Sequence, residues 1–273
     1  MADSSSVRGA GPNKCCDSEH PTVAPLSYKT RGKEVALANG DQAYLVSPAG
    51  LTPANLGIVL VYDAFGFEIV NTRRFADMLA DQANAHVIMP DFFRGKPWPL
   101  TDFPPKQPSA FSEWLEKNGS WSVVFPLLRA ANTYVQGLLP EGDRDKMGIL
   151  GFSWGGKQVL RACSDKTLGY LAGVSIHGYM ITPDDAKNIS VPLFFMPSGE
   201  DPPIDPLKAI LDKRPFGDKC RYYTFTEERH GFASARGDLN DQGTLEAINQ
   251  TIALAAAFFK ENLREGTSDS ECN

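Results

Sequence analysis

The stretch that decides the fold runs from Lys146 to Gln158 and reads KMGILGFSWGGKQ. It contains two overlapping patterns. Residues 151–157 match G-x-x-x-x-G-K, which is most of a phosphate-binding P-loop. Residues 151–155 match G-x-S-x-G, the nucleophile elbow, in which a serine sits on a tight turn between a strand and a helix. The two patterns predict different chemistry, so the residues around them must distinguish the two interpretations.

The P-loop interpretation fails at the residue after the lysine. A P-loop requires Ser or Thr there, because that hydroxyl binds the Mg²⁺ that bridges the phosphates. This chain has Gln158 instead, and the next strand that we expect ends in His177 rather than in an Asp for the metal. The sequence therefore argues against a nucleotide-phosphate site.

The nucleophile-elbow interpretation agrees with the residues on both sides of Ser153. A strand is expected at Gly148–Leu150 and a helix at Lys157–Cys163. Glycines flanking the serine relieve crowding where its backbone is strained, and the helix N-terminus behind it favours developing negative charge. The pattern is short, however, so the residues that follow must supply its catalytic partners.

In the α/β-hydrolases, where this elbow is found, the catalytic triad runs in the chain order Ser, then Asp or Glu, then His. Asp201 follows an expected strand that ends at Met196, and His230 lies in a loop after the next strand. We therefore expect Ser153, Asp201 and His230 to act together, with Glu200 or Asp205 as competitors for the role of the acid.

Strands and helices alternate along most of the chain, which predicts an α/β fold: a mostly parallel central sheet with helices on both faces. The run Gly57–Tyr62 is apolar at both faces, as a buried parallel strand requires. The other expected strands are Gln42–Val46, His86–Met89, Leu171–Ile176, Val191–Met196 and Arg221–Phe225. The other expected helices are Val70–Ala83, Ser109–Asn118, Val123–Leu139, Leu207–Lys213 and Leu245–Leu263.

The length and composition of the chain indicate the number of domains and the cellular compartment. The 273 residues suit one domain over residues 26–264, between a flexible arm at 1–25 and a flexible tail at 265–273. Residues 1–24 lack the apolar core of a signal peptide, and no apolar run reaches about 18 residues. We therefore expect a cytoplasmic protein without a membrane partner.

Charge and cysteine content narrow the possible partners. The net charge is −6 without long runs of like charge, which argues against nucleic acid as a partner. Five irregularly spaced cysteines fit neither a disulfide framework nor a zinc site, and the adjacent Cys15 and Cys16 are expected to be exposed thiols. We expect no metal, no cofactor, and a monomer or a homodimer.

Taken together, the motifs resemble the dienelactone hydrolase family over residues 33–263. The resemblance implies an α/β-hydrolase fold, the triad Ser153, Asp201 and His230, and an oxyanion hole formed by the backbone N–H groups of Ala64 and Trp154. It rests on six segments, which are residues 62–67 (YDAFGF), 71–73 (NTR), 89–98 (MPDFFRGKPW), 151–156 (GFSWGG), Asp201, and 230–232 (HGF).

The chain departs from the familiar members of this family at two positions. Where they carry a cysteine nucleophile this chain has Ser153, and where bacterial members have a glutamate it has Asp63. A serine alcohol is protonated at neutral pH, so it depends on a histidine to remove its proton during attack. The change favours a serine esterase mechanism and argues against dienelactone as the natural substrate.

We therefore predict a serine hydrolase that cleaves small ester or lactone substrates through an acyl-serine intermediate. The alternatives are a non-catalytic ligand-binding protein of the same fold and an acyltransferase that uses the same triad. The Pro- and aromatic-rich segment 91–122 is expected to form part of a lid. Arg94, or else Arg73, is a candidate to bind a substrate carboxylate, and His177 is expected to be a hydrogen-bonded residue near the pocket. The expected substrate-binding residues are Asp63, Phe65, Arg94, Trp98, His177 and Phe232.

Overall fold

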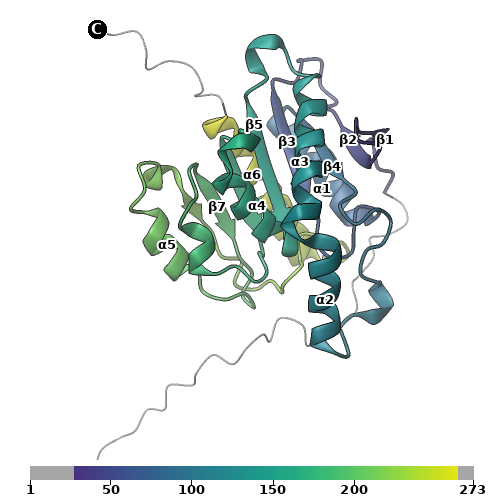
Figure 1. The fold of residues 1–273 in the computed structure, drawn as a ribbon, viewed down its shortest axis with the longest axis vertical. Helices are drawn as coiled ribbons and strands as arrows, with labels where there is room; N and C mark the ends of the chain where they lie inside the picture. Colours follow the sequence, from purple (N-terminus) through teal and green to yellow (C-terminus); the bar gives the residue numbers. More distant parts are fainter. Residues whose placement is uncertain (1–27, 264–273) are drawn as a thin grey trace, which may run out of the picture.

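The computed structural model describes residues 28–263, which form an eight-stranded sheet with helices on both faces (Figure 1). The predicted arm and tail lie outside the described residues. Across the sheet the strand order is β1-β2-β4-β3-β5-β6-β7-β8. The strands are β1 (Lys33–Ala36), β2 (Gln42–Val46), β3 (Leu56–Val61), β4 (Ala85–Pro90), β5 (Met147–Phe152), β6 (Ala172–Ile176), β7 (Leu193–Met196) and β8 (Arg221–Tyr222).

The strands from β4 to β8 are parallel to one another, whereas β2 runs antiparallel to both of its neighbours, β1 and β4. Every residue of β3 and of β5 is buried, because helices cover both faces of these central strands. In the register, Val61 pairs with Gly151, which pairs in turn with Ser175. The carboxyl ends of β3, β5 and β6 therefore reach the same edge of the sheet.

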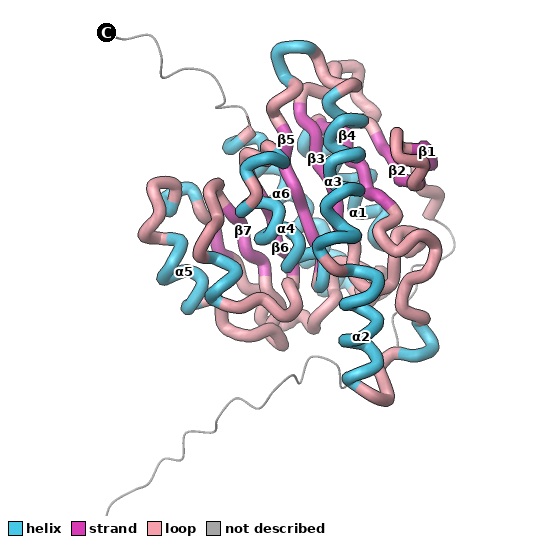
Figure 2. Tube along the Cα trace, viewed as in Figure 1, coloured by secondary structure: helices cyan, strands magenta, loops and turns pink. Residues whose placement is uncertain are grey.

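The helices form two layers (Figures 1 and 2). Helices α1 and α6 contact each other on one face, while α3 and α4 pack on the other. Helix α2 extends beyond the sheet and contacts α3. The bounds are α1 (Val70–Ala83), α2 (Pro108–Gly119), α3 (Trp121–Gln136), α4 (Trp154–Ser164), α5 (Asp205–Leu211) and α6 (Gln242–Asn262).

The helix ends follow local chemistry. Asp241 caps α6 by accepting a hydrogen bond from the backbone N–H of Thr244 at 2.8 Å, and α1 ends at Asn84 in the left-handed conformation that favours Asn and Gly. The sequence predicted α1 and β2 to the residue and the other predicted elements with small shifts. It overestimated β8, in which only Arg221–Tyr222 pair as a strand, and it missed β1.

The turn from β5 into α4 places backbone against backbone. A Cβ added to Gly155 would overlap the carbonyl oxygen of Val61 and lie 2.6 Å from that of Tyr62, at the end of the neighbouring strand β3. A Cβ added to Gly151 would overlap the carbonyl oxygen of Gly155. Only glycine fits at these two positions, because the obstacles are main-chain atoms at the end of β3 and in the first turn of α4, which cannot move aside.

We predict that Gly155→Ala lowers the free energy of unfolding by about 1–3 kcal/mol or prevents folding, because overpacking against fixed backbone is costly. Gly243→Ala is the matched control, since its added Cβ would meet only a side-chain oxygen of Asp241 at 3.4 Å. Urea denaturation of both variants provides the measurement. Equal midpoints for Gly155→Ala and the wild type would contradict the close approach.

Candidate active site

Ser153 sits on a strained turn between β5 and α4. Its backbone has φ 52° and ψ −116°, a conformation that non-glycine residues rarely adopt and that costs about 1–3 kcal/mol. Its N–H donates to the carbonyl of Ile176, and its own carbonyl accepts from the N–H groups of Gly156 and Tyr179. These three backbone hydrogen bonds hold the strained residue, so its hydroxyl projects from the carboxyl edge of the sheet.

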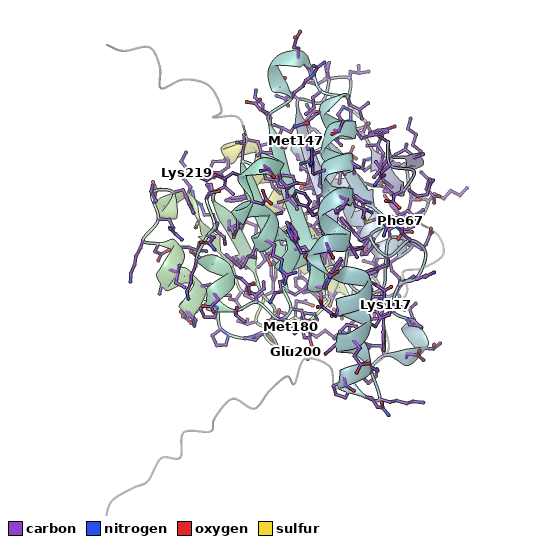
Figure 3. All side chains as sticks on the ribbon, in the orientation of Figure 1. Phe67, Lys117, Met147, Met180, Glu200 and Lys219 are labelled. Carbon is purple, nitrogen blue, oxygen red and sulfur yellow. The ribbon has the colours of Figure 1, made fainter. Side chains whose placement is uncertain are left out.

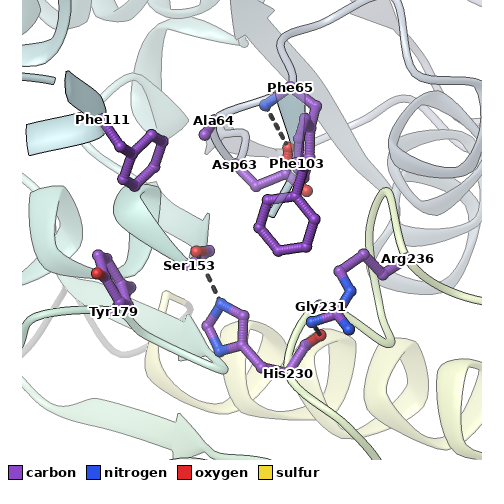
Figure 4. A pocket seen from close by; sticks show the side chains of 10 residues that line it. All are labelled: Asp63, Ala64, Phe65, Phe103, Phe111, Ser153, Tyr179, His230, Gly231 and Arg236. Carbon is purple, nitrogen blue, oxygen red and sulfur yellow. Dashed lines mark hydrogen bonds between the residues drawn. The ribbon is translucent and has the colours of Figure 1, made fainter. Parts of the chain in front are cut away.

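The structure brings the three predicted triad residues together. The Ser153 Oγ lies 2.9 Å from Nε2 of His230 (Figure 4). Nδ1 of the same ring lies 2.6 Å from Oδ1 of Asp201. His230 follows β8 and Asp201 follows β7, so the three residues come from three neighbouring loops. Both distances lie within the range of a hydrogen bond that can transfer a proton.

The surroundings of Asp201 favour its charged form. Burial opposes the charge, but the hydrogen bond and electrostatic attraction of His230, followed by electrostatic attraction to His177 and the hydrogen bond from Ser198, outweigh it and lower the pKa of this carboxyl below its usual value. Oδ2 accepts from both the N–H and the hydroxyl of Ser198, at 2.7 and 2.9 Å. The carboxylate is therefore fixed, with its other oxygen directed to His230. Glu200 accepts the backbone N–H of His230 instead, and Asp205 begins α5.

A small cavity lies beside Ser153 and His230 (Figure 4). Its volume is about 30 Å³, which holds about one or two water molecules. Its walls are mostly apolar and aromatic. The lining residues are Asp63, Ala64, Phe65, Phe103, Phe111, Ser153, Tyr179, His230, Gly231 and Arg236.

Asp63 lines this cavity and joins two of its loops. One carboxylate oxygen accepts the N–H of Phe65 at 2.9 Å, and the other accepts the Ser234 hydroxyl at 2.7 Å and the N–H of Ala235 at 3.2 Å. Burial raises the pKa of Asp63, while these hydrogen bonds act in the opposite direction. The side chain thereby fixes the loop after β3 against the segment that follows His230.

Arg94 and Trp98 do not line the cavity, although both were expected to bind substrate. Arg94 is bound to Asp41 by two hydrogen bonds, and 52% of its side chain is exposed. Trp98 packs against Phe111 and Trp114, behind the cavity wall. The alternative residue Arg73 bridges Glu34 and Glu68.

His177 and Phe232 lie behind His230 rather than in the cavity, and both are fully buried. The rings of His177 and His230 are 5.0 Å apart, and His177 also packs against Phe152 and Phe232. Neither nitrogen of the His177 ring has a hydrogen-bond partner, which differs from the sequence prediction. The imidazole instead fills an apolar space against the catalytic candidate.

Five cavity residues, including Gly231, were not predicted as site residues, although Phe103 and Phe111 lie in segment 91–122, which was expected to form part of a lid. Phe103, Phe111 and Tyr179 come from separate loops and from α2, so no local pattern joins them to Ser153. Arg236 is buried, and its Nη1 donates to the carbonyl of His230 at 2.8 Å.

These features define the class of protein. A mostly parallel sheet, a strained serine between a strand and a helix, and an acid and a histidine in that chain order are the features of an α/β-hydrolase. The family model described as the dienelactone hydrolase family matches residues 42–263. The chain belongs to the dienelactone hydrolase family, which confirms both the predicted family and the predicted class of carboxylic ester hydrolases.

Relatives and solved structures agree with this assignment. The chain is 30% identical to the human carboxymethylenebutenolidase homolog, over 80% of this chain and 84% of the relative, and 31% identical to the mouse homolog, over 81% and 85%. It is also 27% identical to an AIM2 family protein of Schizosaccharomyces pombe, over 90% and 98%. The fold is similar to that of a dienelactone hydrolase from Anabaena variabilis, with a TM-score of 0.59 and 19% identity over 86% of this chain and 99% of that chain.

Within residues 28–263, none of the helices has the length and apolar character needed to cross a membrane. In the same part of the chain, we found no cluster of three or more His, Cys, Asp or Glu side chains that would hold a metal ion.

We predict that His177 makes the fold sensitive to acid. Burial, and then the charge of His230, lower the pKa of His177 from 6.5 to about 3. Its contribution to stability is therefore fully present above pH 6.5 and is lost as the pH falls toward 3, by roughly 2 kcal/mol at pH 5. Urea denaturation between pH 7 and pH 5 should show a smaller loss of unfolding free energy for His177→Leu than for the wild type. Parallel pH dependences would refute the prediction, since every other titrating group is common to both proteins.

Proposed function

We propose that this protein hydrolyses small carboxylic esters or lactones through an acyl-serine intermediate. The observation that carries the proposal is the continuous hydrogen-bonded chain from Ser153 Oγ through His230 to Asp201, at 2.9 and 2.6 Å. Such an arrangement lets a neutral imidazole remove the serine proton while the carboxylate stabilises the imidazolium that forms.

The reaction would proceed in two halves. As Ser153 Oγ attacks the ester carbonyl, its proton passes to Nε2 of His230, and a tetrahedral intermediate forms. His230 then protonates the leaving alcohol, and the acyl group stays on Ser153. In the second half a water molecule loses its proton to His230 and attacks the acyl-serine, which releases the acid and restores the serine hydroxyl.

The oxyanion would be stabilised by the backbone N–H groups of Ala64 and Trp154. Ala64 lines the cavity beside Ser153, and Trp154 is the first residue of α4, where helical N–H groups have no partner within the helix. The Trp154 ring packs against Phe92 and Phe93, which holds the turn in place. One such donor is typically worth about 10²–10³ in rate.

The cavity wall favours small apolar acyl or alcohol groups. Phe65, Phe103, Phe111 and Tyr179 supply most of the lining, and Arg236 and Asp63 place charge at one side. Phe111 is on α2, so this helix forms one wall of the cavity. The comparison with hydrolases favours ester cleavage over the alternatives of ligand binding without catalysis and acyl transfer.

Ser153→Ala tests the mechanism. We expect turnover of p-nitrophenyl acetate to fall at least about 10³-fold, because no other group in the triad can form the acyl-enzyme. Ser164→Ala, at the far end of α4, is the matched control; its hydroxyl donates to the carbonyl of Leu160, away from the cavity. A Ser153→Ala variant that keeps full activity, or a wild type that is not labelled at Ser153 by a fluorophosphonate, would falsify the proposal.

Phe111→Ala tests the size limit. The variant should enlarge the cavity and raise kcat/KM for p-nitrophenyl hexanoate relative to the acetate about tenfold, in the range expected for apolar pocket changes. Phe125→Ala is the control, since Phe125 packs against Trp121 on α3 and does not line the cavity. An unchanged ratio of the two esters would show that Phe111 does not set acyl size.

A further inference from the structure

His230 is held at its ring and at both backbone polar groups. Asp201 binds Nδ1 of the ring at 2.6 Å, and Arg236 donates to the backbone carbonyl at 2.8 Å. The backbone N–H donates to Oε2 of Glu200 at 2.9 Å. Since Glu200 and Asp201 are consecutive, one short loop after β7 binds both the side chain and the main chain of His230.

The two acidic residues thus have separate contacts. The sequence left Glu200 as a competitor of Asp201 for the role of the triad acid, but the Glu200 carboxylate meets the amide and not the ring. Glu200 is exposed and lies at the lower edge of the sheet, on the same side as Met180 (Figure 3). Its hydrogen bond holds the backbone of His230 and does not contact the imidazole ring.

Main-chain hydrogen bonds join the segment before His230 to β7 and the loop after it: the N–H of Tyr223 donates to Phe195, and that of Phe225 to Pro197. Strand β8 pairs only through Arg221–Tyr222, and beyond it a single bridge joins Ser198 to Phe225. The N–H of Gly199 donates to the carbonyl of Glu228 at 3.0 Å, two residues before His230. The Glu200 hydrogen bond comes next and falls on His230 itself.

We propose that Glu200 is a positioning residue, which fixes the backbone of His230 and thereby directs Nε2 at Ser153. The proposal rests on the Ser-His-Asp function proposed above and adds a residue to it. A displacement of the imidazole by about 1 Å from its proton-transfer geometry can lower the rate up to about 10²-fold. A hydrogen bond that fixes the backbone of His230 can therefore affect the rate.

The effect comes from the hydrogen bond rather than from the charge. Because Glu200 is exposed, solvent and salt screen its charge, whereas the hydrogen bond is directional and short. A glutamine at this position keeps an oxygen that accepts the N–H of His230 and removes the charge. Glu200→Gln should therefore retain the positioning of His230, and Glu200→Ala should lose it.

The test compares Glu200→Ala, Glu200→Met and Glu200→Gln in the full chain, with Glu227→Ala as the control. Glu227 is an exposed carboxylate of the loop that carries His230, and it accepts a hydrogen bond from the hydroxyl of Thr226. Initial rates on p-nitrophenyl acetate give kcat and KM, and the rate of Ser153 labelling by a fluorophosphonate gives nucleophile reactivity without turnover. Thermal unfolding of each variant establishes that the assayed protein is folded.

We expect Glu200→Ala and Glu200→Met to lower kcat and the labelling rate about tenfold while KM changes less than about twofold, because proton transfer and not binding is affected. Glu200→Gln should stay within about threefold of the wild type, and Glu227→Ala should match it. If Glu200→Ala folds poorly, Glu200→Met, which has similar length but no acceptor, decides the question alone.

Two results would overturn the proposal: full activity in both variants that lack an acceptor, or a glutamine variant as impaired as alanine. Ser153→Ala, assayed in parallel, separates the two levels of inference. If Ser153→Ala stays active, the proposed function itself fails. If Ser153→Ala is inactive and Glu200→Met is normal, only the positioning role fails.

Discussion

The structure of this site depends on the close approach of the β5–α4 turn to the end of β3. Gly155 lies against the carbonyl oxygens of Val61 and Tyr62, so the turn can pass only where no side chain intervenes. This contact forces Ser153 into its strained conformation and starts α4 directly behind it. The strain is tolerated because backbone hydrogen bonds to β6 and its loop surround the residue.

Hydrogen bonds between loops hold the residues around Ser153 in place and so complete the site. Asp63 joins the loop after β3 to the segment after His230, and Asp201 and Glu200 join the loop after β7 to His230. Each carboxylate binds groups on another loop, so the positions of the loops depend on one another. The catalytic candidates are thus fixed relative to the sheet through polar contacts, while aromatic residues close the cavity around them.

The sequence predicted the central elements well because their signals are local. The buried run in β3 and the helical spacing in α1 each lie within one segment, and the glycines around Ser153 report directly on backbone geometry. The sequence predicted the edge strands of the sheet poorly. Strand β1 has a largely exposed face and β8 pairs over two residues, so neither leaves a strong apolar pattern.

By itself the sequence determined the fold class, the family and the chain order of Ser153, Asp201 and His230, because the turn at Ser153 and the strand ends are encoded by neighbouring residues. Only the tertiary structure decided what surrounds them. It placed Arg94 on Asp41, paired Glu200 with the backbone of His230, and brought Phe111 and Arg236 to the cavity. The physical reason is that these contacts join residues far apart in the chain, and their geometry is set by how helices and loops pack on the sheet.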